Sequence, residues 1–297
     1  MSETYEAGAY AVALHGGAGP RHGRDYRETE AHMLALATMC RDRLADGESA
    51  LDVVEHAVAG LEASGLYVAG RGGAPNRSGF VELDASIMDG SMRRGGGVCA
   101  VRDLVSPVAA ARRVMEKTPH VLLAGSGAAA FARAERLAFV GEPHTYYRVP
   151  VGVDEKDLTT TEISHGTVGC VARDREGRLA AATSTAGVFG KMEGRVGDTP
   201  LIGAGTWADE HVAASCTGVG EAFILAGGAQ DVASRVQYAR QSLVEACEGM
   251  LVDVAKQRGD GGLIAVDAGG RIAFSWNSGG LKRAAAGETL EPLALTF

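Results

Sequence analysis

The chain has 297 residues, of which 46% are hydrophobic and 22% charged, and its formal net charge is −8. The acidic balance argues against a nucleic-acid or anionic-membrane partner, since either would favour a basic face. No segment approaches the roughly 18 uninterrupted apolar residues of a membrane span, and the first ten residues, MSETYEAGAY, lack the features of a signal peptide. We therefore expect a globular, cytoplasmic protein with no nucleic-acid and no membrane partner.

Cysteine and glycine usage adds two expectations. The five cysteines are far apart and form no CxxC, which favours reduced thiols in the cytoplasm. Glycine accounts for 42 residues, about twice its usual share of roughly 7%. The excess predicts tight turns and close backbone approaches.

The first half of the chain alternates helical patterns with glycine-rich segments. Helices are predicted over 27–45, 49–63, 107–117 and 128–137. Strands are predicted over 10–15, 80–88 and 121–124. The first strand runs into a predicted turn, HGGAG at 15–19, and Ser49 with Asp52 resembles a capping box. Residues 64–79 and 95–97 are glycine-rich, and 141–165 read as a polar, exposed connection.

From residue 167 onward, short strands prevail. TVGCVARD and LAAATST form a predicted hairpin, PLIGAGTWAD and HVAASCTG a second pair, and GLIAVD and RIAFSWN a third. Helices are predicted near 220–227, 231–238 and 241–257. Helices around many short, mostly antiparallel strands predict a layered α+β fold rather than a doubly wound α/β sheet.

Thr167 is the most specific candidate for chemistry. On its own it is best explained as a strand residue, because threonine favours strands. Scission between Gly166 and Thr167, however, would give Thr167 a free α-amine that titrates near pH 8. One residue would then supply both nucleophile and base.

Two further clusters suggest a substrate site. Arg195 could bind a carboxylate bidentately while Asp198 holds an ammonium, which together would grip an α-amino acid. On their own, the two residues are better explained as a loop ion pair, with each other or with neighbours. Thr217 and Gly218 could place a hydroxyl beside a backbone N–H as oxyanion donors, or could simply form a turn.

These motifs resemble the plant-type L-asparaginase/isoaspartyl peptidase family of N-terminal nucleophile (Ntn) hydrolases. The resemblance rests on the block from GTVGCVARD through GRVGDTPLIGAGTWAD to SCTGVGE, together with HGGAG, ELDASIMDG and GGLIAVD in the same order. It covers nearly the whole chain. It implies a four-layer αββα sandwich made as one precursor domain, 1–297, which cleaves itself into an α subunit, 1–166, and a β subunit, 167–297.

The resemblance also implies roles for individual residues. Thr167 would be the nucleophile freed by scission after Gly166, and Thr185 would orient it. Arg195 would hold the substrate α-carboxylate and Asp198 its α-ammonium. The remaining roles would fall to glycines and a threonine. Thr217 and Gly218 would stabilise the oxyanion, and Gly218 and Gly220 would contact the substrate.

No cofactor is expected, and the resemblance leaves room for a structural sodium ion without requiring it. In the family a loop holds sodium through backbone carbonyls; the corresponding residues here are Leu61, Glu62, Ser64, Tyr67, Ala69 and Arg71. The chain departs from the family where GLYVAG, 65–70, replaces a PLFNAG-like run, so that Val68 stands in place of an asparagine. Self-association as (αβ)₂ is implied as well.

The sequence thus predicts a threonine hydrolase that acts on β-aspartyl (isoaspartyl) peptides and L-asparagine, with a small molecule or dipeptide as substrate. Two alternatives stay open at this point. One is a glycosylasparaginase-like amidase with the same fold. The other is a non-catalytic amino-acid binder, which only Val68 favours.

Overall fold

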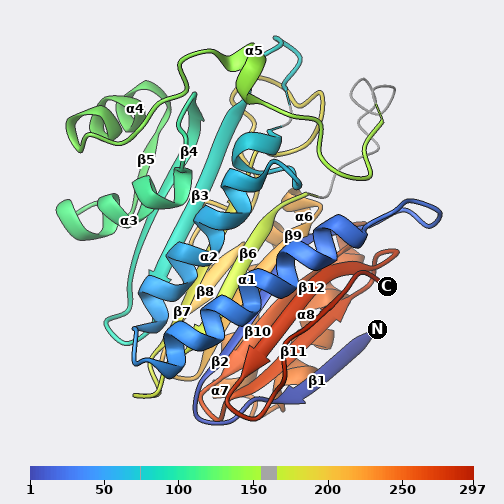
Figure 1. Ribbon diagram of the computed structural model, residues 1–297. Helices are drawn as coiled ribbons and strands as arrows, with labels where there is room; N and C mark the ends of the chain where they lie inside the picture. Colours follow the sequence, from blue (N-terminus) through green and yellow to red (C-terminus); the bar gives the residue numbers. More distant parts are fainter. Residues whose placement is uncertain (74, 155–165) are drawn as a thin grey trace.

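The architecture is a four-layer sandwich. The computed structural model describes residues 1–73, 75–154 and 166–297. Within these residues two β-sheets lie face to face, and helices cover the outer face of each sheet (Figure 1). The prediction of an α+β, αββα sandwich is therefore confirmed.

The larger sheet has eight strands and carries the start of the predicted β subunit at its centre. Its order is β13 (Leu293–Leu295), β12 (Leu281–Gly287), β2 (Ala11–Ala18), β6 (Val168–Arg173), β7 (Leu179–Thr185), β3 (Glu82–Asp89), β4 (Arg94–Arg102) and β5 (Leu122–Ala124). All neighbours are antiparallel except β4 and β5.

The smaller sheet has five antiparallel strands. Its order is β1 (Ser2–Glu6), β11 (Arg271–Trp276), β10 (Gly261–Asp267), β9 (Val212–Gly218) and β8 (Thr206–Ala208). The predicted strand pairs in the second half of the chain are present, although β8 is much shorter than the predicted PLIGAGTWAD.

Each sheet has its own helices. The larger sheet is covered by α1 (Arg27–Ala45), α2 (Ala50–Ser64), α3 (Pro107–Lys117) and α4 (Gly125–Ala134); the smaller by α6 (Gly220–Ala226), α7 (Gly228–Gln237) and α8 (Leu243–Lys256). The Ser49 hydroxyl accepts from the Asp52 N–H, and Ser242 with Glu245 forms a full capping box, so both helices begin where side chains satisfy their free N–H groups. No helix in the described ranges has the length and apolarity to cross a membrane.

The hydrophobic core has two main parts. One lies between the larger sheet and its helices and includes Leu14 of β2, Val54 of α2 and Val114 of α3. The other lies between the sheets and beneath α7 and α8, where Phe274 packs with Met250. The alternation of sides along each strand explains this division, because successive residues face opposite layers.

The predicted HGGAG turn is wrong, because β2 continues through Ala18. Residues 95–97 likewise belong to β4. These glycines permit close packing rather than turns. A Cβ at Gly16 would lie 2.6 Å from the Tyr67 ring, and one at Gly96 would lie 2.2 Å from the Ala111 carbonyl oxygen of α3.

Other boundaries also differ from the prediction. The helix predicted at 128–137 spans Gly125–Ala134, and strands β1, β4, β12 and β13 were not predicted. In the predicted connection at 141–165, residues Pro143–Tyr146 form the short helix α5, whereas 155–165 fall outside the described residues.

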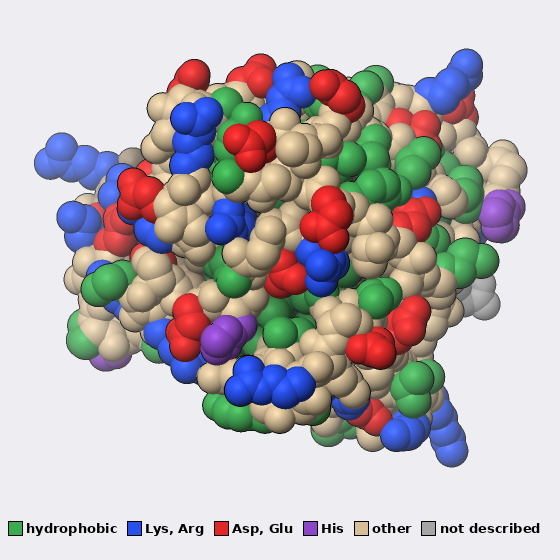
Figure 2. Space-filling model, turned by 90° about the horizontal axis from the view of Figure 1, so that it is seen from below, with side chains coloured by type: hydrophobic (Ala, Val, Ile, Leu, Met, Phe, Trp, Pro, Cys, Tyr) green, Lys and Arg blue, Asp and Glu red, His purple; other side chains and the backbone are tan. Residues whose placement is uncertain are grey.

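Charges of both signs are mixed on the surface seen in Figure 2. Lysine and arginine side chains lie among aspartate and glutamate side chains, with no broad basic area on that face. This distribution accords with the net charge of −8.

Candidate active site

Thr167 lies immediately before β6, in the middle of the larger sheet between β2 and β7. Its side chain is buried, and its Oγ1 donates a hydrogen bond to Thr185 Oγ1 at 3.1 Å. Thr185 Oγ1 also accepts from the Gly187 N–H at 3.0 Å. Thr185, at the end of β7, therefore fixes the orientation of the Thr167 hydroxyl.

A small cavity collects most of the predicted site residues. It has a volume of about 10 Å³, which is room for a single water. The predicted residues that line it are Thr167, Thr185, Arg195, Asp198 and Gly218. Residues distant in the sequence thus meet around one hydroxyl.

Arg195 pairs with Glu221 rather than with Asp198. Its Nε and Nη2 bind the two Glu221 carboxylate oxygens at 2.9 and 2.8 Å. This bidentate geometry is the one by which a guanidinium binds any carboxylate. A substrate α-carboxylate that binds these two N–H groups would have to replace Glu221.

Asp198 is a buried carboxyl group. Its Oδ2 has no hydrogen-bond partner among the described residues, and neither has Oγ1 of the adjacent Thr199. Burial raises the pKa of Asp198 to about 7, although Arg195 and backbone N–H groups oppose the shift. An unpaired buried carboxyl costs free energy unless a ligand pairs with it. The two free oxygen atoms are suited to an ammonium group.

Gly220 leaves room for these two side chains. A Cβ at this position would lie 2.9 Å from Asp198 Oδ1 and 3.0 Å from Arg195 Nη2. Gly220 is the first residue of α6. This predicted substrate-binding residue therefore lies beside both the Asp198 carboxyl group and the Arg195 guanidinium.

Gly218 borders the cavity, and Thr217 precedes it on β9. Thr217 is buried, and its Oγ1 accepts from the Ala18 N–H at 3.3 Å. That bond leaves the hydroxyl hydrogen of Thr217 available to donate. Ala18 of the HGGAG segment therefore holds Thr217, a predicted oxyanion donor, in place. The turn predicted for this segment would not have given it that role.

A chain of hydrogen bonds runs from the His15 imidazole through four buried hydroxyl groups and links the two sheets beneath the site. Consecutive members are 2.5–2.9 Å apart, and they are His15 Nε2, Ser215, Thr183, Thr206 and Ser86. Ser86 also donates to the Thr199 carbonyl at 2.6 Å. Burial lowers the pKa of His15 to about 3, so its imidazole is neutral at physiological pH. The chain fixes the strand carrying Thr183 relative to the segment carrying Asp198 and Thr199.

Val68 lies directly against the predicted scission point. A Cβ at Gly166 would be 2.1 Å from both Cβ and Cγ2 of Val68. The Val68 carbonyl accepts from the Ala186 N–H at 3.0 Å, which ties the 65–70 loop to the end of β7. Only glycine fits at position 166 beside this valine.

The loop implicated in sodium binding follows the C-terminus of α2. Hydrogen bonds close it, from the Ala69 N–H to the Tyr67 carbonyl at 2.8 Å and from the Gly72 N–H to the Ala69 carbonyl at 3.0 Å. The loop is so tight that a Cβ at Gly72 would lie 1.8 Å from the Tyr67 carbonyl oxygen. Each of these carbonyls keeps a second lone pair beside its hydrogen bond.

Several residues around the nucleophile escaped the sequence analysis. Gly187, Val188, Gly197 and Thr199 also line the cavity. Their only signal was proximity to the predicted residues in the glycine-rich 186–199 segment. Glu221 lies at the end of the longer stretch 165–221, which is rich in hydroxyl and charged residues, and its bond to Arg195 required the fold.

A four-layer sandwich with a buried, hydrogen-bonded threonine at the head of a central strand defines a class, the Ntn hydrolases. A comparison with known families narrows the class, since the family described as Asparaginase matches residues 8–149 and 145–292. The chain belongs to this asparaginase family, in its plant-type group.

Curated relatives agree with this membership. The chain is 42% identical over 294 residues to the isoaspartyl peptidase of Salmonella typhimurium, covering 92% of this chain and 94% of the relative. It is 38% identical to the probable isoaspartyl peptidase/L-asparaginase 2 of Arabidopsis thaliana, covering 95% and 97%. It is 39% identical to the human isoaspartyl peptidase/L-asparaginase, covering 93% and 92%. The chain is therefore an enzyme, a hydrolase of this family.

Proposed function

We propose that this protein cleaves itself between Gly166 and Thr167 and then hydrolyses isoaspartyl peptides and L-asparagine. The observation that carries the proposal is the Thr167 hydroxyl. It is oriented by Thr185 at 3.1 Å and shares one cavity with Arg195 and Asp198. The names of the relatives, isoaspartyl peptidase and L-asparaginase, support this substrate class.

Self-cleavage takes place at the Gly166–Thr167 peptide bond. The Thr167 Oγ1 attacks the Gly166 carbonyl carbon, and the peptide bond is exchanged for an ester as the nitrogen takes a proton. Water then hydrolyses the ester, leaving a carboxylate on Gly166 and a free α-amine on Thr167. The products are the α subunit, 1–166, and the β subunit, 167–297.

In turnover, the free α-amine of Thr167 takes the hydroxyl proton while Oγ1 attacks the β-carbonyl of the substrate. Arg195 binds the α-carboxylate, and Asp198 in its ionised form binds the α-ammonium. Thr217 and the Gly218 N–H stabilise the oxyanion. The amine leaves with the proton, and water hydrolyses the aspartyl ester on Thr167.

The two alternatives have less support. A glycosylasparaginase-like activity would act on a bulkier leaving group, and the three relatives carry other names. A non-catalytic binder would not need the Thr167–Thr185 hydrogen bond that this chain retains.

Three further features belong to the same proposal. Sodium would be held by the carbonyls of the 61–71 loop, where it would rigidify the loop next to Val68. Two cleaved protomers would assemble as (αβ)₂. A cytoplasmic location is supported by the five cysteines, all of which are buried and unpaired.

Denaturing gels and N-terminal sequencing test the proposal directly. Purified protein should show two fragments, and the smaller should begin at Thr167. Thr167→Ala should remain one chain and release no aspartate from β-aspartyl-leucine or asparagine. Hydrolysis by that variant at the wild-type rate would refute the assigned nucleophile.

A matched control separates chemistry from folding. Thr183→Ala removes a buried hydroxyl on β7, two residues before Thr185, but not the nucleophile. It should still be cut at Gly166–Thr167, even if it is less stable. A single uncut chain in both variants would point to misfolding instead.

A further inference from the structure

The Arg195–Glu221 ion pair lies on the solvent side of the predicted substrate clamp. The Glu221 side chain is 60% exposed, whereas that of Arg195 is 17% exposed. Arg195 lines the Thr167 cavity, and Glu221 is not among the described residues that line it. The guanidinium therefore lies between the cavity on one side and the Glu221 carboxylate on the other.

Glu221 uses only one of the two edges of the guanidinium that can bind a carboxylate. A guanidinium carries five N–H groups, and Glu221 accepts from Nε and from Nη2 of Arg195. The groups that remain are both N–H groups of Nη1 and the second N–H of Nη2. Together they form a second edge, which can bind another carboxylate bidentately.

The positions of two glycines show that this second edge faces the cavity. A Cβ at Gly197, which lines the cavity, would lie 2.8 Å from Arg195 Nη1. A Cβ at Gly220 would lie 3.0 Å from Arg195 Nη2 and 2.9 Å from Asp198 Oδ1. The Nη1–Nη2 edge thus lies at the cavity wall, close to the Asp198 carboxyl group. An α-amino acid held there would have its carboxylate on Arg195 and its ammonium beside Asp198.

Glu221 would affect substrate binding in opposite ways at the two edges. A substrate carboxylate on the Nε–Nη2 edge would have to displace Glu221, which would then weaken binding. A carboxylate on the Nη1–Nη2 edge leaves Glu221 in place, where it holds the long Arg195 side chain in one conformation. The position of the cavity favours the second case. The negative charge of Glu221 repels the substrate only weakly, because water screens a side chain that is 60% exposed.

We infer that Glu221 is a positioning residue, which holds Arg195 by its Nε–Nη2 edge so that the Nη1–Nη2 edge binds the substrate α-carboxylate. The inference rests on the proposed function and adds a residue to the same site. Ordering a long side chain on binding lowers affinity, and a partner that has already ordered the side chain removes this cost. Glu221 thus contributes to affinity without touching the substrate.

Kinetics of the cleaved enzyme with asparagine test this assignment. Glu221→Ala should raise KM about fivefold, the cost of ordering one side chain. It should leave kcat within about twofold, because Arg195 binds the α-carboxylate equally in the ground and transition states. Glu221→Gln should raise KM less, since its amide oxygen still accepts one hydrogen bond. A pH of about 8.5 keeps Asp198, whose pKa is about 7, ionised in every variant.

Two inhibitors separate the carboxylate contact from a general change in the site. L-Aspartate carries the α-carboxylate, whereas β-alanine has the same ammonium and side-chain carboxylate but lacks the α-carboxylate. In Glu221→Ala, the inhibition constant of L-aspartate should rise about fivefold, and that of β-alanine should change less than about twofold. A loss of structure around the site would weaken both inhibitors alike.

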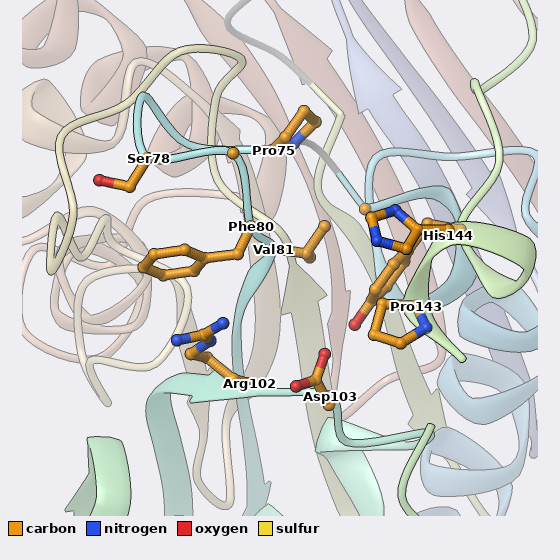
Figure 3. Close-up of a pocket in the computed structure, with 11 residues that line it drawn as sticks. Pro75, Ser78, Phe80, Val81, Arg102, Asp103, Pro143 and His144 are labelled. Carbon is orange, nitrogen blue, oxygen red and sulfur yellow. The ribbon is translucent and has the colours of Figure 1, made fainter. Parts of the chain in front are cut away.

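Glu193→Ala is the matched control, because Glu193 carries the same charge two residues before Arg195. Glu193 is exposed and accepts from the Ser78 hydroxyl at 3.2 Å. Ser78 lines a separate cavity of about 450 Å³ beside β3, and the two cavities share no described lining residue (Figure 3). The control should leave KM and both inhibition constants at their wild-type values.

An unchanged or lower KM in Glu221→Ala would overturn the assignment, and a lower value would mean that Glu221 competes with the substrate for Arg195. Equal effects on L-aspartate and β-alanine, or an effect matched by Glu193→Ala, would overturn it as well. Wild-type protein that hydrolyses neither asparagine nor β-aspartyl peptides would instead refute the proposed function. Dissociation constants of L-aspartate from calorimetry would then test the assignment by the same ratio, and a wild type that binds no L-aspartate would overturn both.

Discussion

At the scale of single residues, Val68 and Gly166 form the most specific contact around the scission point. The side chain of Val68 occupies the space of a Cβ at position 166, at 2.1 Å. The contact holds the scissile carbonyl in one position relative to the Thr167 hydroxyl. A misplacement of about 1 Å at a reacting centre is enough to lower a rate about a hundredfold.

Gly166→Ala should therefore slow self-cleavage by about a hundredfold, because its methyl group displaces the scissile carbonyl. The added variant Val68→Gly should restore much of the rate, since its nearest remaining atom, the Val68 Cα, is 3.1 Å from that methyl position. Time courses on denaturing gels measure both rates.

Leu83→Ala is the control for this pair, because it removes a side chain from the same cluster. Added to Gly166→Ala, it should not restore cleavage. Equal rescue by Leu83→Ala and Val68→Gly would mean that general loosening of the cluster, not the contact with Gly166, determines the rate.

Asp198 gives the uncut protein a specific pH dependence. Its pKa is about 7 in the folded state, raised from 3.8 by burial, so the folded state binds a proton more tightly than the unfolded state does. Its contribution to stability is therefore complete below about pH 4 and declines as pH rises to about 7.

In a Thr167→Ala background, the substitution Asp198→Asn should change the free energy of unfolding more favourably at pH 8 than at pH 4. The difference between the two variants should grow by at most about 4 kcal/mol across this range. Urea unfolding at both pH values measures it. Glu62, whose pKa is also raised to about 7, is common to both variants and cancels. A difference that does not vary with pH would contradict the raised pKa of Asp198.

At the scale of secondary-structure elements, the sequence predicted the long helices well because their apolar periodicity and caps are local. It failed where glycine serves long-range packing. Gly16 and Gly96 look like turn residues, but they lie in strands because Tyr67 and α3 approach them closely. A local sequence pattern cannot show which residue, distant in the chain, packs against these glycines.

The same distinction applies to the site. The family motif predicted Thr167, Thr185, Arg195, Asp198 and Gly218, and the structure brings all five to one cavity. It could not predict that Glu221 pairs with Arg195, nor that Val68 lies against Gly166. Those contacts join loops whose relative positions depend on the assembled sheets.

Glu62 shows how one side chain ties two helices. Located on α2, its carboxylate accepts from the Ser106 hydroxyl at 2.7 Å and from the Val108 N–H at 3.0 Å, at the start of α3. Glu62→Ala should lower the free energy of unfolding by about 2 kcal/mol, since it leaves a buried N–H unpaired. Glu62→Gln should lose less, because the amide oxygen can still accept one of these bonds.

Glu55→Ala, on the same helix, is the control for this measurement. Glu55 lies 3.6 Å from Arg112 in a partly exposed pair, and its loss should cost less than about 1 kcal/mol. Urea unfolding of the three variants gives the comparison. A loss in Glu55→Ala as large as that in Glu62→Ala would show that Glu62 is not a specific tether.

At the scale of the whole molecule, the predicted cut falls inside one sheet. Strands β6 and β7, which belong to the proposed β subunit, lie between β2 and β3 of the proposed α subunit. β12 from the β subunit pairs with the other edge of β2. The fragments are thus interleaved, and neither has a complete sheet on its own. Cleavage should leave them associated under native conditions.

Interleaving predicts how stability should depend on concentration. Unfolding of the cleaved protein releases two chains from each protomer, whereas unfolding of Thr167→Ala releases one. By mass action, tenfold dilution should lower the free energy of unfolding per protomer by about 1.4 kcal/mol more in the cleaved protein. Urea midpoints at two concentrations measure the effect, and assembly into (αβ)₂ cancels because both forms share it. The same concentration dependence in both proteins would mean that the fragments stay together when unfolded, and that the interleaved sheet is not what joins them.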